Sequence, residues 1–134
     1  MNLQAEIQFY DQSGPFSNED GFQVATARLL DTLQDEGVIF WAFSGTNIYR
    51  RAISRNKGQA ARLGALTKRM GAKKGIHDCL IFSHQLTIEL KNGKGNFSPE
   101  QKEWKATAEG WGWSCNLAKT PAEVLAILKV EGIL

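Results

Sequence analysis

Two short apolar runs in the middle of the chain, Cys79–Phe82 and Gln85–Leu90, are separated by only two residues. Strand-like runs joined by so short a loop predict a β-hairpin. Whether the loop holds two residues or four, the register places Asp78 opposite Glu89; a loop of odd length would break this pairing. Opposed side chains share one face of a sheet, with Cβ atoms about 4.5–5.5 Å apart, and strand alternation puts Lys91 on that face as well.

An aspartate and a glutamate held side by side repel each other, which raises the pKa of one of them unless a cation lies between them. Carboxylate oxygens suit Mg²⁺, which is commonly held by one or two carboxylates while water and phosphate oxygens complete its coordination. The amine of Lys91 could help to position or deprotonate a metal-bound water, or stabilise charge on a phosphate. The alternative is an ordinary ion network of the same three residues at a sheet end, which spacing alone slightly favours.

Charged residues are distributed very unevenly along the chain. No Asp or Glu occurs in the 41 residues between Glu36 and Asp78, yet this stretch carries nine of the 16 basic residues. It therefore has a net charge of +9 and the rest of the chain −7, although the whole chain is only +2. Such a segment suits a polyanion, most simply a nucleic-acid backbone; the alternative is a solvated basic helix without a partner. The nine residues are Arg50, Arg51, Arg55, Lys57, Arg62, Lys68, Arg69, Lys73 and Lys74.

The first part of the chain predicts an edge strand, a helix and a buried strand. Residues 5–10 alternate weakly between apolar and polar side chains, which favours a short edge strand or arm. An amphipathic helix follows, capped by Ser17 or Asn18 and ending near Gly37. Residues 38–43 then predict a buried strand.

The remaining segments predict a basic helix over residues 57–70, the hairpin, and two more helices with a strand between them. Ser98, followed by proline and by glutamine three positions on, marks a helix start. Residues 111–117 predict a strand, and Thr120 marks the last helix. This order is typical of a mixed α/β domain with a central β-sheet. Three apolar residues of the basic helix are expected to face inward: Ala61, Leu66 and Met70.

The length of 134 residues suits one compact domain. No apolar run approaches the roughly 20 residues that span a bilayer, and the first residues lack the pattern of a signal peptide. Cys79 and Cys115 are too few and too far apart for a zinc ribbon or a disulfide framework, so we expect reduced thiols in the core. These features predict a soluble intracellular protein without a membrane partner.

Histidines and tryptophans could also carry function, but we expect structural roles for them. Neither His77 nor His84 has a second His or Cys at metal-ligand spacing, so zinc is not expected and both are interpreted as turn or surface residues. His77 should also point to the opposite side of its strand from Asp78. Tryptophans can stack on bases, but in strands and amphipathic helices they belong more often to the core; the four are Trp41, Trp104, Trp111 and Trp113.

The region around the hairpin resembles a known nuclease superfamily. Asp78, separated by ten residues from Glu89-Leu-Lys91, resembles the D-x(n)-E-x-K signature of the PD-(D/E)xK nucleases. The following segment, with Phe97-Ser-Pro-Glu-Gln101 at its centre, resembles one branch of these enzymes, the VRR-NUC (virus-type replication-repair nuclease) domain.

The resemblance covers roughly residues 18–130 and implies a restriction-endonuclease-like core, a central mixed β-sheet flanked by helices. Within the predicted first helix, Glu19 and Gln23 match a Glu-x-x-x-Gln of the family. Residues 1–17 precede the usual start, and we assign them to an N-terminal extension or edge arm of a single nuclease domain spanning residues 1–134.

The resemblance also implies the roles of the residues near the hairpin. Asp78 and Glu89 would be metal ligands, with the backbone carbonyl of Leu90 as a third, and Lys91 would be the catalytic lysine. The implied cofactor is Mg²⁺, for which Mn²⁺ would substitute.

Two further residues would approach this site from helices. Glu19 would reach it from the first helix and Gln101 from the start of the later one. Each has an alternative interpretation, because a glutamate in a first turn complements the helix dipole and a glutamine there can close its own cap.

Taken together, the resemblance implies a Mg²⁺-dependent DNA endonuclease that hydrolyses phosphodiester bonds in replication, recombination or repair. Since phosphate contacts carry no base information, we expect selection of branched DNA, such as a four-way (Holliday) junction or a flap, by a homodimer. A cytoplasmic protein is expected, in the cytoplasm of a host cell if the chain is phage-encoded. The expected DNA-binding residues are Arg50, Arg51, Arg55, Lys73, Lys74 and Lys94.

Two other functions remain open. The protein could be a non-catalytic DNA-binding accessory module in which the acidic pair is structural, or a sequence-specific, restriction-like endonuclease. RNA also stays open as a substrate, because the basic segment has no base-reading signature.

Overall fold

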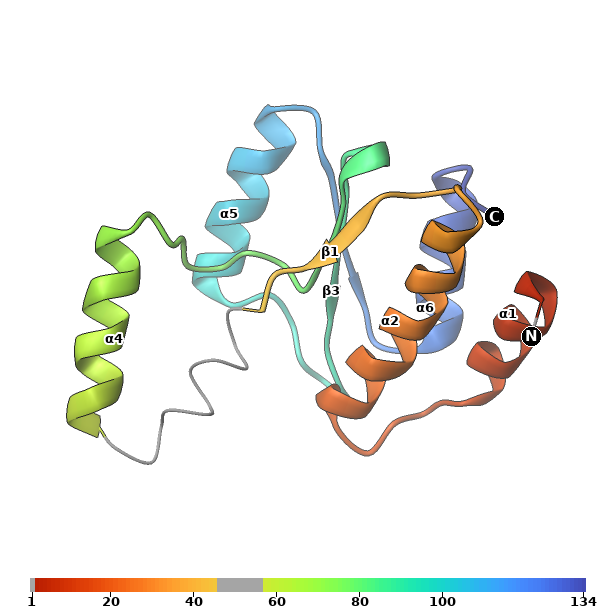
Figure 1. Ribbon diagram of the computed structural model, residues 1–134, viewed down its shortest axis with the longest axis horizontal. Coiled ribbons are helices and arrows are strands. Elements are labelled where there is room, and N and C mark those ends of the chain that lie inside the picture. The colour runs from red at the N-terminus through yellow and green to blue at the C-terminus, as the bar shows by residue number, and fades with distance from the viewer. Residues whose placement is uncertain (1, 46–56) are drawn as a thin grey trace.

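The computed structural model describes residues 2–45 and 57–134 (Figure 1). Within these residues, four strands form one sheet in the order β1-β2-β3-β4, in which β1, β2 and β3 are antiparallel neighbours and β4 runs parallel to β3. The predicted mixed α/β class with a central sheet is confirmed. The strands are β1 (Trp41–Phe43), β2 (Cys79–Ile81), β3 (Leu86–Leu90) and β4 (Ser114–Ala118), and a 3₁₀ helix η1 (Phe82–His84) joins β2 to β3.

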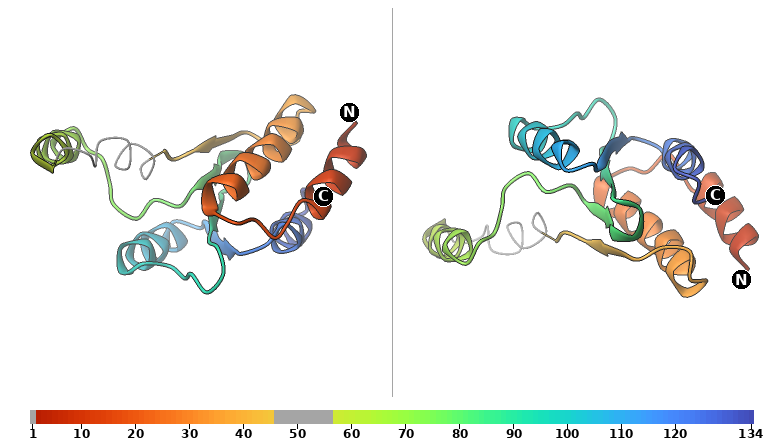
Figure 2. Two further views of the ribbon diagram at one scale, coloured as in Figure 1. Left: turned by 90° about the horizontal axis from the view of Figure 1, so that it is seen from below. Right: turned by 90° about the horizontal axis from the view of Figure 1, so that it is seen from above.

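Helices lie on both sides of the sheet (Figure 2). α5 (Pro99–Gly110) lies on one side, whereas α2 (Glu19–Asp35) and α6 (Pro121–Val130) lie on the other, and α1 (Leu3–Gln12) packs against both of these. The main core forms between the sheet and α1, α2 and α6. Its strand residues are Trp41, Cys79, Ile81, Leu86, Ile88, Leu90 and Ala118.

The predicted hairpin forms with the predicted register. Ile81 pairs with Leu86, so the loop has four residues, one of the two loop lengths predicted to keep Asp78 opposite Glu89. Within this loop Gln85 takes a φ of 47° in the left-handed region. The pairing therefore places Asp78 opposite Glu89.

The predicted capping residues begin three of the helices. Asn18, rather than Ser17, accepts a main-chain N–H in the first turn of α2 at 2.8 Å. Ser98 and Gln101 form a capping box at the start of α5, and Thr120 caps α6. These helices begin as predicted because each cap is encoded within a few residues of the chain.

The prediction of an edge strand or arm at residues 5–10 is wrong, because this segment belongs to α1. Asn2 accepts the N–H of Ala5 at 2.8 Å and so caps the helix. Glu6 and Tyr10, four positions apart, are its two buried residues. The Tyr10 hydroxyl lies 2.9 Å from Thr26 Oγ1 on α2. Packing of the buried residues, which are spaced four apart as on one face of a helix, therefore outweighs the weak alternation of three apolar residues.

The basic helix forms where predicted, as α4 (Lys57–Arg69), but its apolar residues do not face inward. Leu66 is 44% exposed and Met70 77%, and Ala61 is also exposed. Figure 1 shows α4 standing apart from the sheet, at the left of the view. Helical periodicity defines an apolar stripe but does not determine whether a core lies against it.

The cysteines and tryptophans match their expected places only in part. Cys79 and Cys115 are free and buried, and Trp41 is in the core, as expected. Trp111, in contrast, ends α5 and is 81% exposed, so its assignment to the core is wrong. Among the helices of the described ranges, none is long and apolar enough to cross a membrane.

Candidate active site

Asp78 and Glu89 meet at the end of the hairpin opposite its loop. Asp78 directly precedes β2, and Glu89 is the penultimate residue of β3. The main-chain N–H of Asp78 donates to Glu89 Oε1 at 3.0 Å, and the main-chain N–H of Leu90 donates to Asp78 Oδ2 at 2.9 Å. Each carboxylate therefore accepts a main-chain hydrogen bond from the other segment, which fixes the two side chains beside each other.

Burial controls the ionisation of this pair. Glu89 is 1% exposed, and burial, followed by the negative charge of Asp78, raises the pKa of Glu89 to about 8. Burial also raises the pKa of Asp78. Two buried carboxyl groups this close do not both ionise readily, so burial and mutual repulsion favour a metal-free pair that shares one proton. A divalent cation bound between them would replace that proton.

Lys91 supplies a positive charge to the same pair. Its Nζ lies 3.3 Å from Glu89 Oε2, and the lysine side chain is only 18% exposed. Its main-chain N–H donates to the carbonyl of Ala118 at the end of β4, at 3.0 Å, which anchors the residue to the sheet. The charge of Lys91 lowers the pKa of both carboxyl groups, although burial outweighs it. Lys91 therefore lies where strand alternation predicted.

Gln101 both closes the cap of α5 and reaches the acidic pair. Its side-chain Oε1 accepts the main-chain N–H of Ser98 at 2.8 Å, while its Nε2 donates to Glu89 Oε2 at 2.5 Å. Because the capping bond requires the amide oxygen, the amide nitrogen must face Glu89. The two interpretations of Gln101 are therefore compatible, and the cap orients the amide.

Glu19 lies near the pair but is more weakly placed. It is exposed in the first turn of α2, and its Oε1 accepts the main-chain N–H of Asn92 at 3.4 Å. Its charge contributes to the raised pKa of Asp78. One turn further along α2, Gln23 Nε2 lies 3.8 Å from Cys79 Sγ, and Gln23 Oε1 is buried without a hydrogen-bond partner in the part of the chain that the structure describes.

The expected third ligand, the carbonyl of Leu90, belongs to the last residue of β3, directly after Glu89. The described ranges contain no group of three or more His, Cys, Asp and Glu side chains arranged to hold a metal. A metal at this site would therefore take two side-chain carboxylates, and main-chain, water or phosphate oxygens would complete its coordination.

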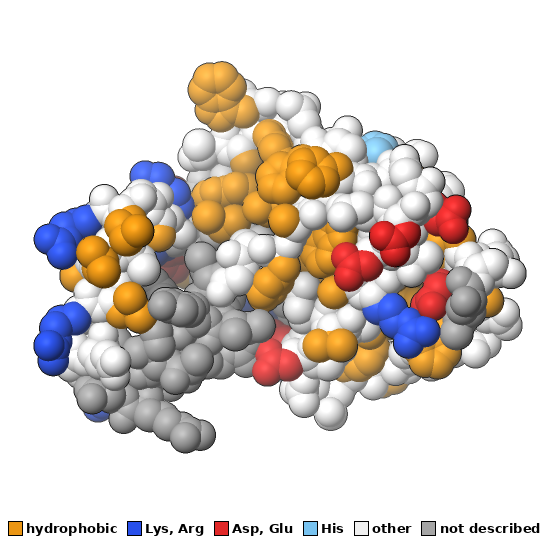
Figure 3. Space-filling view, in the orientation of Figure 1, with side chains coloured by type: hydrophobic (Ala, Val, Ile, Leu, Met, Phe, Trp, Pro, Cys, Tyr) orange, Lys and Arg blue, Asp and Glu red, His pale blue; other side chains and the backbone are white. Residues whose placement is uncertain are grey.

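Only some of the expected DNA-binding residues lie in described segments. Lys73 and Lys74, between α4 and β2, and Lys94, after β3, are all exposed. Figure 3 shows Lys and Arg side chains gathered over α4 at the left of the molecule, and most of the Asp and Glu side chains on the other half of this face. Three of the expected residues, Arg50, Arg51 and Arg55, lie outside the described residues.

His77 is the residue that the sequence interpretation misplaced. It is fully buried, not a turn or surface residue. Its Nδ1 lies 2.7 Å from Thr87 Oγ1 and its Nε2 3.2 Å from the carbonyl oxygen of Gln101. The rings of Phe97 and Trp104 pack against it, with centroids at 4.8 and 5.0 Å. Burial lowers the pKa of His77 below its ordinary value, so the ring is neutral.

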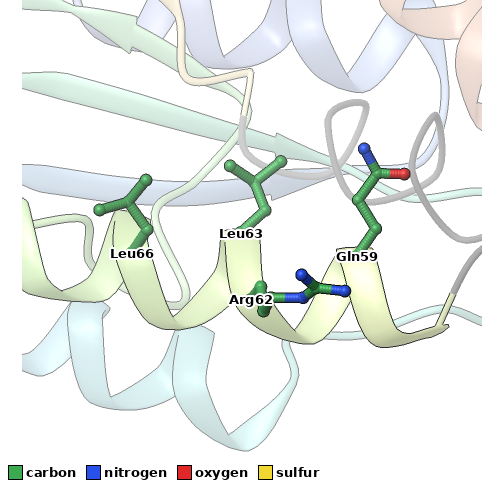
Figure 4. A pocket seen from close by; sticks show the side chains of 4 residues that line it. All are labelled: Gln59, Arg62, Leu63 and Leu66. Carbon is green, nitrogen blue, oxygen red and sulfur yellow. The ribbon is translucent and has the colours of Figure 1, made fainter.

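A hollow in the surface lies away from the acidic pair. A hollow of about 390 Å³ on α4 is lined by Gln59, Arg62, Leu63 and Leu66 (Figure 4). None of these residues belongs to the cluster of Asp78 and Glu89, so the hollow is not a pocket of the candidate active site.

Comparisons with protein-family models, with curated proteins and with solved structures find no match to this chain. A function for this protein must therefore be inferred from the residues of the site.

Proposed function

We propose that this protein is a metal-dependent endonuclease with a restriction-endonuclease-like core of the VRR-NUC type, which hydrolyses phosphodiester bonds in DNA. One observation supports this proposal most strongly. Two buried carboxyl groups, Asp78 and Glu89, lie side by side at the open end of a hairpin, and a lysine and a glutamine both contact the same oxygen of Glu89. Burial raises the pKa of Glu89, a property that catalytic and metal-binding acids share.

The donor set of this pair fits Mg²⁺, with Mn²⁺ as a substitute. Carboxylate oxygens are hard ligands, and Glu89 Oε1 and Asp78 Oδ2, which each accept one main-chain hydrogen bond, retain a lone pair for the ion. Asp78, Glu89 and the carbonyl of Leu90 would hold the ion. When bound, it would polarise the scissile phosphate and lower the pKa of a coordinated water.

The other residues of the cluster would prepare this site. Gln101 donates to Glu89 Oε2, and Lys91 places its ammonium group 3.3 Å from the same atom, so both favour the ionised form of Glu89. The ammonium group of Lys91 is also available to stabilise negative charge that develops on the phosphate. Glu19 would approach from α2 and extend the acidic cluster.

The basic residues would hold the nucleic-acid backbone beside this site. Lys73 and Lys74 lie in the segment that leads to Asp78, and Lys94 follows Lys91 by three positions. Phosphate contacts position a duplex without reading its bases, so we propose that the protein selects branched DNA, such as a junction or flap. A homodimer would suit a two-fold symmetric junction, and light scattering in solution would test that state.

The decisive experiment incubates the protein with linear duplex, flap and four-way-junction DNA, with and without Mg²⁺ or Mn²⁺. We expect metal-dependent cutting of branched DNA that Asp78→Asn and Lys91→Ala remove while salt-dependent binding persists. Asp78→Asn keeps an acceptor for the N–H of Leu90, and Lys102→Ala, an exposed lysine on α5, is the matched control. If no substrate is cut under any condition but DNA is bound, the protein is an accessory module; discrete fragments from linear duplex would indicate a sequence-specific enzyme.

A further inference from the structure

His77 directly precedes Asp78, yet the proposed reaction does not use it. Its imidazole lies between two segments that carry site residues: β3, with Glu89, where it contacts Thr87, and the first turn of α5, where it contacts Gln101. Burial of an imidazole is costly unless its ring nitrogens are hydrogen-bonded, and both nitrogens of His77 lie within hydrogen-bond distance of a polar atom.

The hydrogen-bond partners of His77 define its tautomer. The carbonyl oxygen of Gln101 can only accept, so the Nε2 atom of His77 must carry the hydrogen and donate at 3.2 Å. In a neutral ring Nδ1 is then an acceptor, and the hydroxyl of Thr87 donates to it at 2.7 Å. Thr87 thereby orients the ring so that Nε2–H faces α5.

The surroundings of His77 hold this arrangement rigidly. Phe97, Gln101 and Trp104 are spaced so that they meet around the ring at the start of α5, where Phe97 and Trp104 pack against the imidazole. Two residues before His77, Gly75 has a φ of +80°, and a Cβ there would overlap the main chain of Glu100. The segment from Gly75 to His77 is thus fitted directly against the first turn of α5.

We propose that His77 is a positioning residue, which holds the first turn of α5 at the distance where the side-chain amide of Gln101 reaches Glu89. The inference rests on the proposed function, because it concerns the same metal-binding pair. The Gln101 carbonyl is held by His77 and the Gln101 side chain by Ser98 and Glu89. Loss of the imidazole bond would allow the first turn of α5 to shift away from β3, and with it the side-chain donor of Gln101 to Glu89.

Three substitutions separate this bond from the packing of the ring. In His77→Gln the side-chain amide nitrogen can occupy the place of Nε2 and donate to the carbonyl of Gln101. In His77→Asn the shorter amide reaches only the place of Nδ1. His77→Phe keeps an aromatic ring but has no donor. We expect His77→Gln to bind Mn²⁺ within about threefold of the unmodified protein. His77→Asn and His77→Phe should bind it about tenfold or more weakly, as for other residues that orient a ligand.

The Mn²⁺ dissociation constant, measured by electron paramagnetic resonance, is the first readout, and the NMR signal of the Gln101 side-chain amide is the second. Equal Mn²⁺ affinity of all three variants would overturn the inference. If even the unmodified protein binds no Mn²⁺, the proposed function fails, but the Gln101 amide signal still decides the inference: it should be preserved in His77→Gln and shifted in His77→Asn.

A measurement on the unmodified protein decides the matter if the variants fail to fold. Long-range ¹H–¹⁵N spectra distinguish the two neutral tautomers of a histidine. The inference requires the Nε2–H tautomer at His77, and an Nδ1–H tautomer would overturn it.

Discussion

Removal of the ionisable group of Glu89 should change how the stability of this protein depends on pH. In the metal-free fold the pKa of Glu89 is raised from 4.5 to about 8. Between these two values the folded protein holds a proton that the unfolded chain has released. Unfolding therefore releases a proton, and a rise in pH favours the unfolded chain. The stability that Glu89 contributes is present below pH 4.5 and is lost as the pH rises toward 8.

The size of this effect follows from the same pKa difference. Each pH unit inside the window changes the free energy of unfolding by about 1.4 kcal/mol for one proton. From pH 5 to pH 8 the loss is therefore about 4 kcal/mol, a large part of the 5–15 kcal/mol that is typical of a domain. Because Glu89 is 1% exposed, solvent screening reduces this value little.

Urea unfolding followed by tryptophan fluorescence at several pH values between 5 and 8, in a metal-chelated buffer, measures the effect. We expect the free energy of unfolding of Glu89→Gln to vary less with pH than that of the unmodified protein, so that the difference between the two proteins changes by about 4 kcal/mol. The lowered pKa of His77 makes stability rise with pH below its ordinary value of 6.5, but this contribution is common to both proteins and cancels in the difference.

Two controls complete this test. Glu100→Gln, which alters an exposed glutamate in the first turn of α5, should leave the pH dependence unchanged. An excess of Mg²⁺ should restore stability at pH 8 in the unmodified protein but not in Glu89→Gln, because the ion binds the deprotonated pair. If the two proteins show the same pH dependence without metal, the assignment of a bound proton to Glu89 is wrong.

Three further substitutions test the structural supports of the site and the fold. Gly75→Ala should lower the free energy of unfolding by about 3 kcal/mol or more, since a Cβ would overlap the main chain of Glu100. Gly71→Ala, also at positive φ but with no atom within 4 Å of the added Cβ, should cost only about 1 kcal/mol. Equal costs in chemical denaturation would contradict the close packing of Gly75 against α5. Ser98→Ala should lower the free energy of unfolding by about 1 kcal/mol through the lost cap. A lower melting temperature, followed by the circular dichroism signal of the helices, would show this loss. Tyr10→Phe should lose about 1 kcal/mol, because its hydroxyl bonds Thr26; an unchanged melting temperature would count against the assigned packing of α1.

The central part of the fold could be predicted because its signals are local. An even-length loop alone determines that Asp78 faces Glu89, so two apolar runs and the count of residues between them were sufficient. The cap of α5 lies within four residues, from Ser98 to Gln101. That the amide of Gln101 also reaches Glu89 could not be derived from the cap, because the contact joins residues on different elements.

The errors arose where the outcome depends on distant segments. Whether Tyr10 belongs to a strand or a helix is decided by α2, on which its hydroxyl finds Thr26. The burial of His77 depends on Phe97 and Trp104, which follow it by 20 and 27 residues in the sequence. Leu66 illustrates the opposite case, since the bounds of its helix match the local sequence pattern while its exposure depends on what lies against α4. Periodicity therefore predicts that a helix or strand forms more reliably than it predicts which segments pack against it.

The ladder between β2 and β3 ends in side chains rather than in main-chain carbonyls. Beyond Cys79 and Ile88, the amides of Asp78 and Leu90 are satisfied by carboxylate oxygens from the opposite segment. Adjustment of the two carboxylates to a bound ion therefore needs only rotation about their side-chain bonds, and the paired backbone can stay in place. Complexes with ions of different radius should accordingly superimpose over residues 79–88 and differ in the χ angles of the two acids.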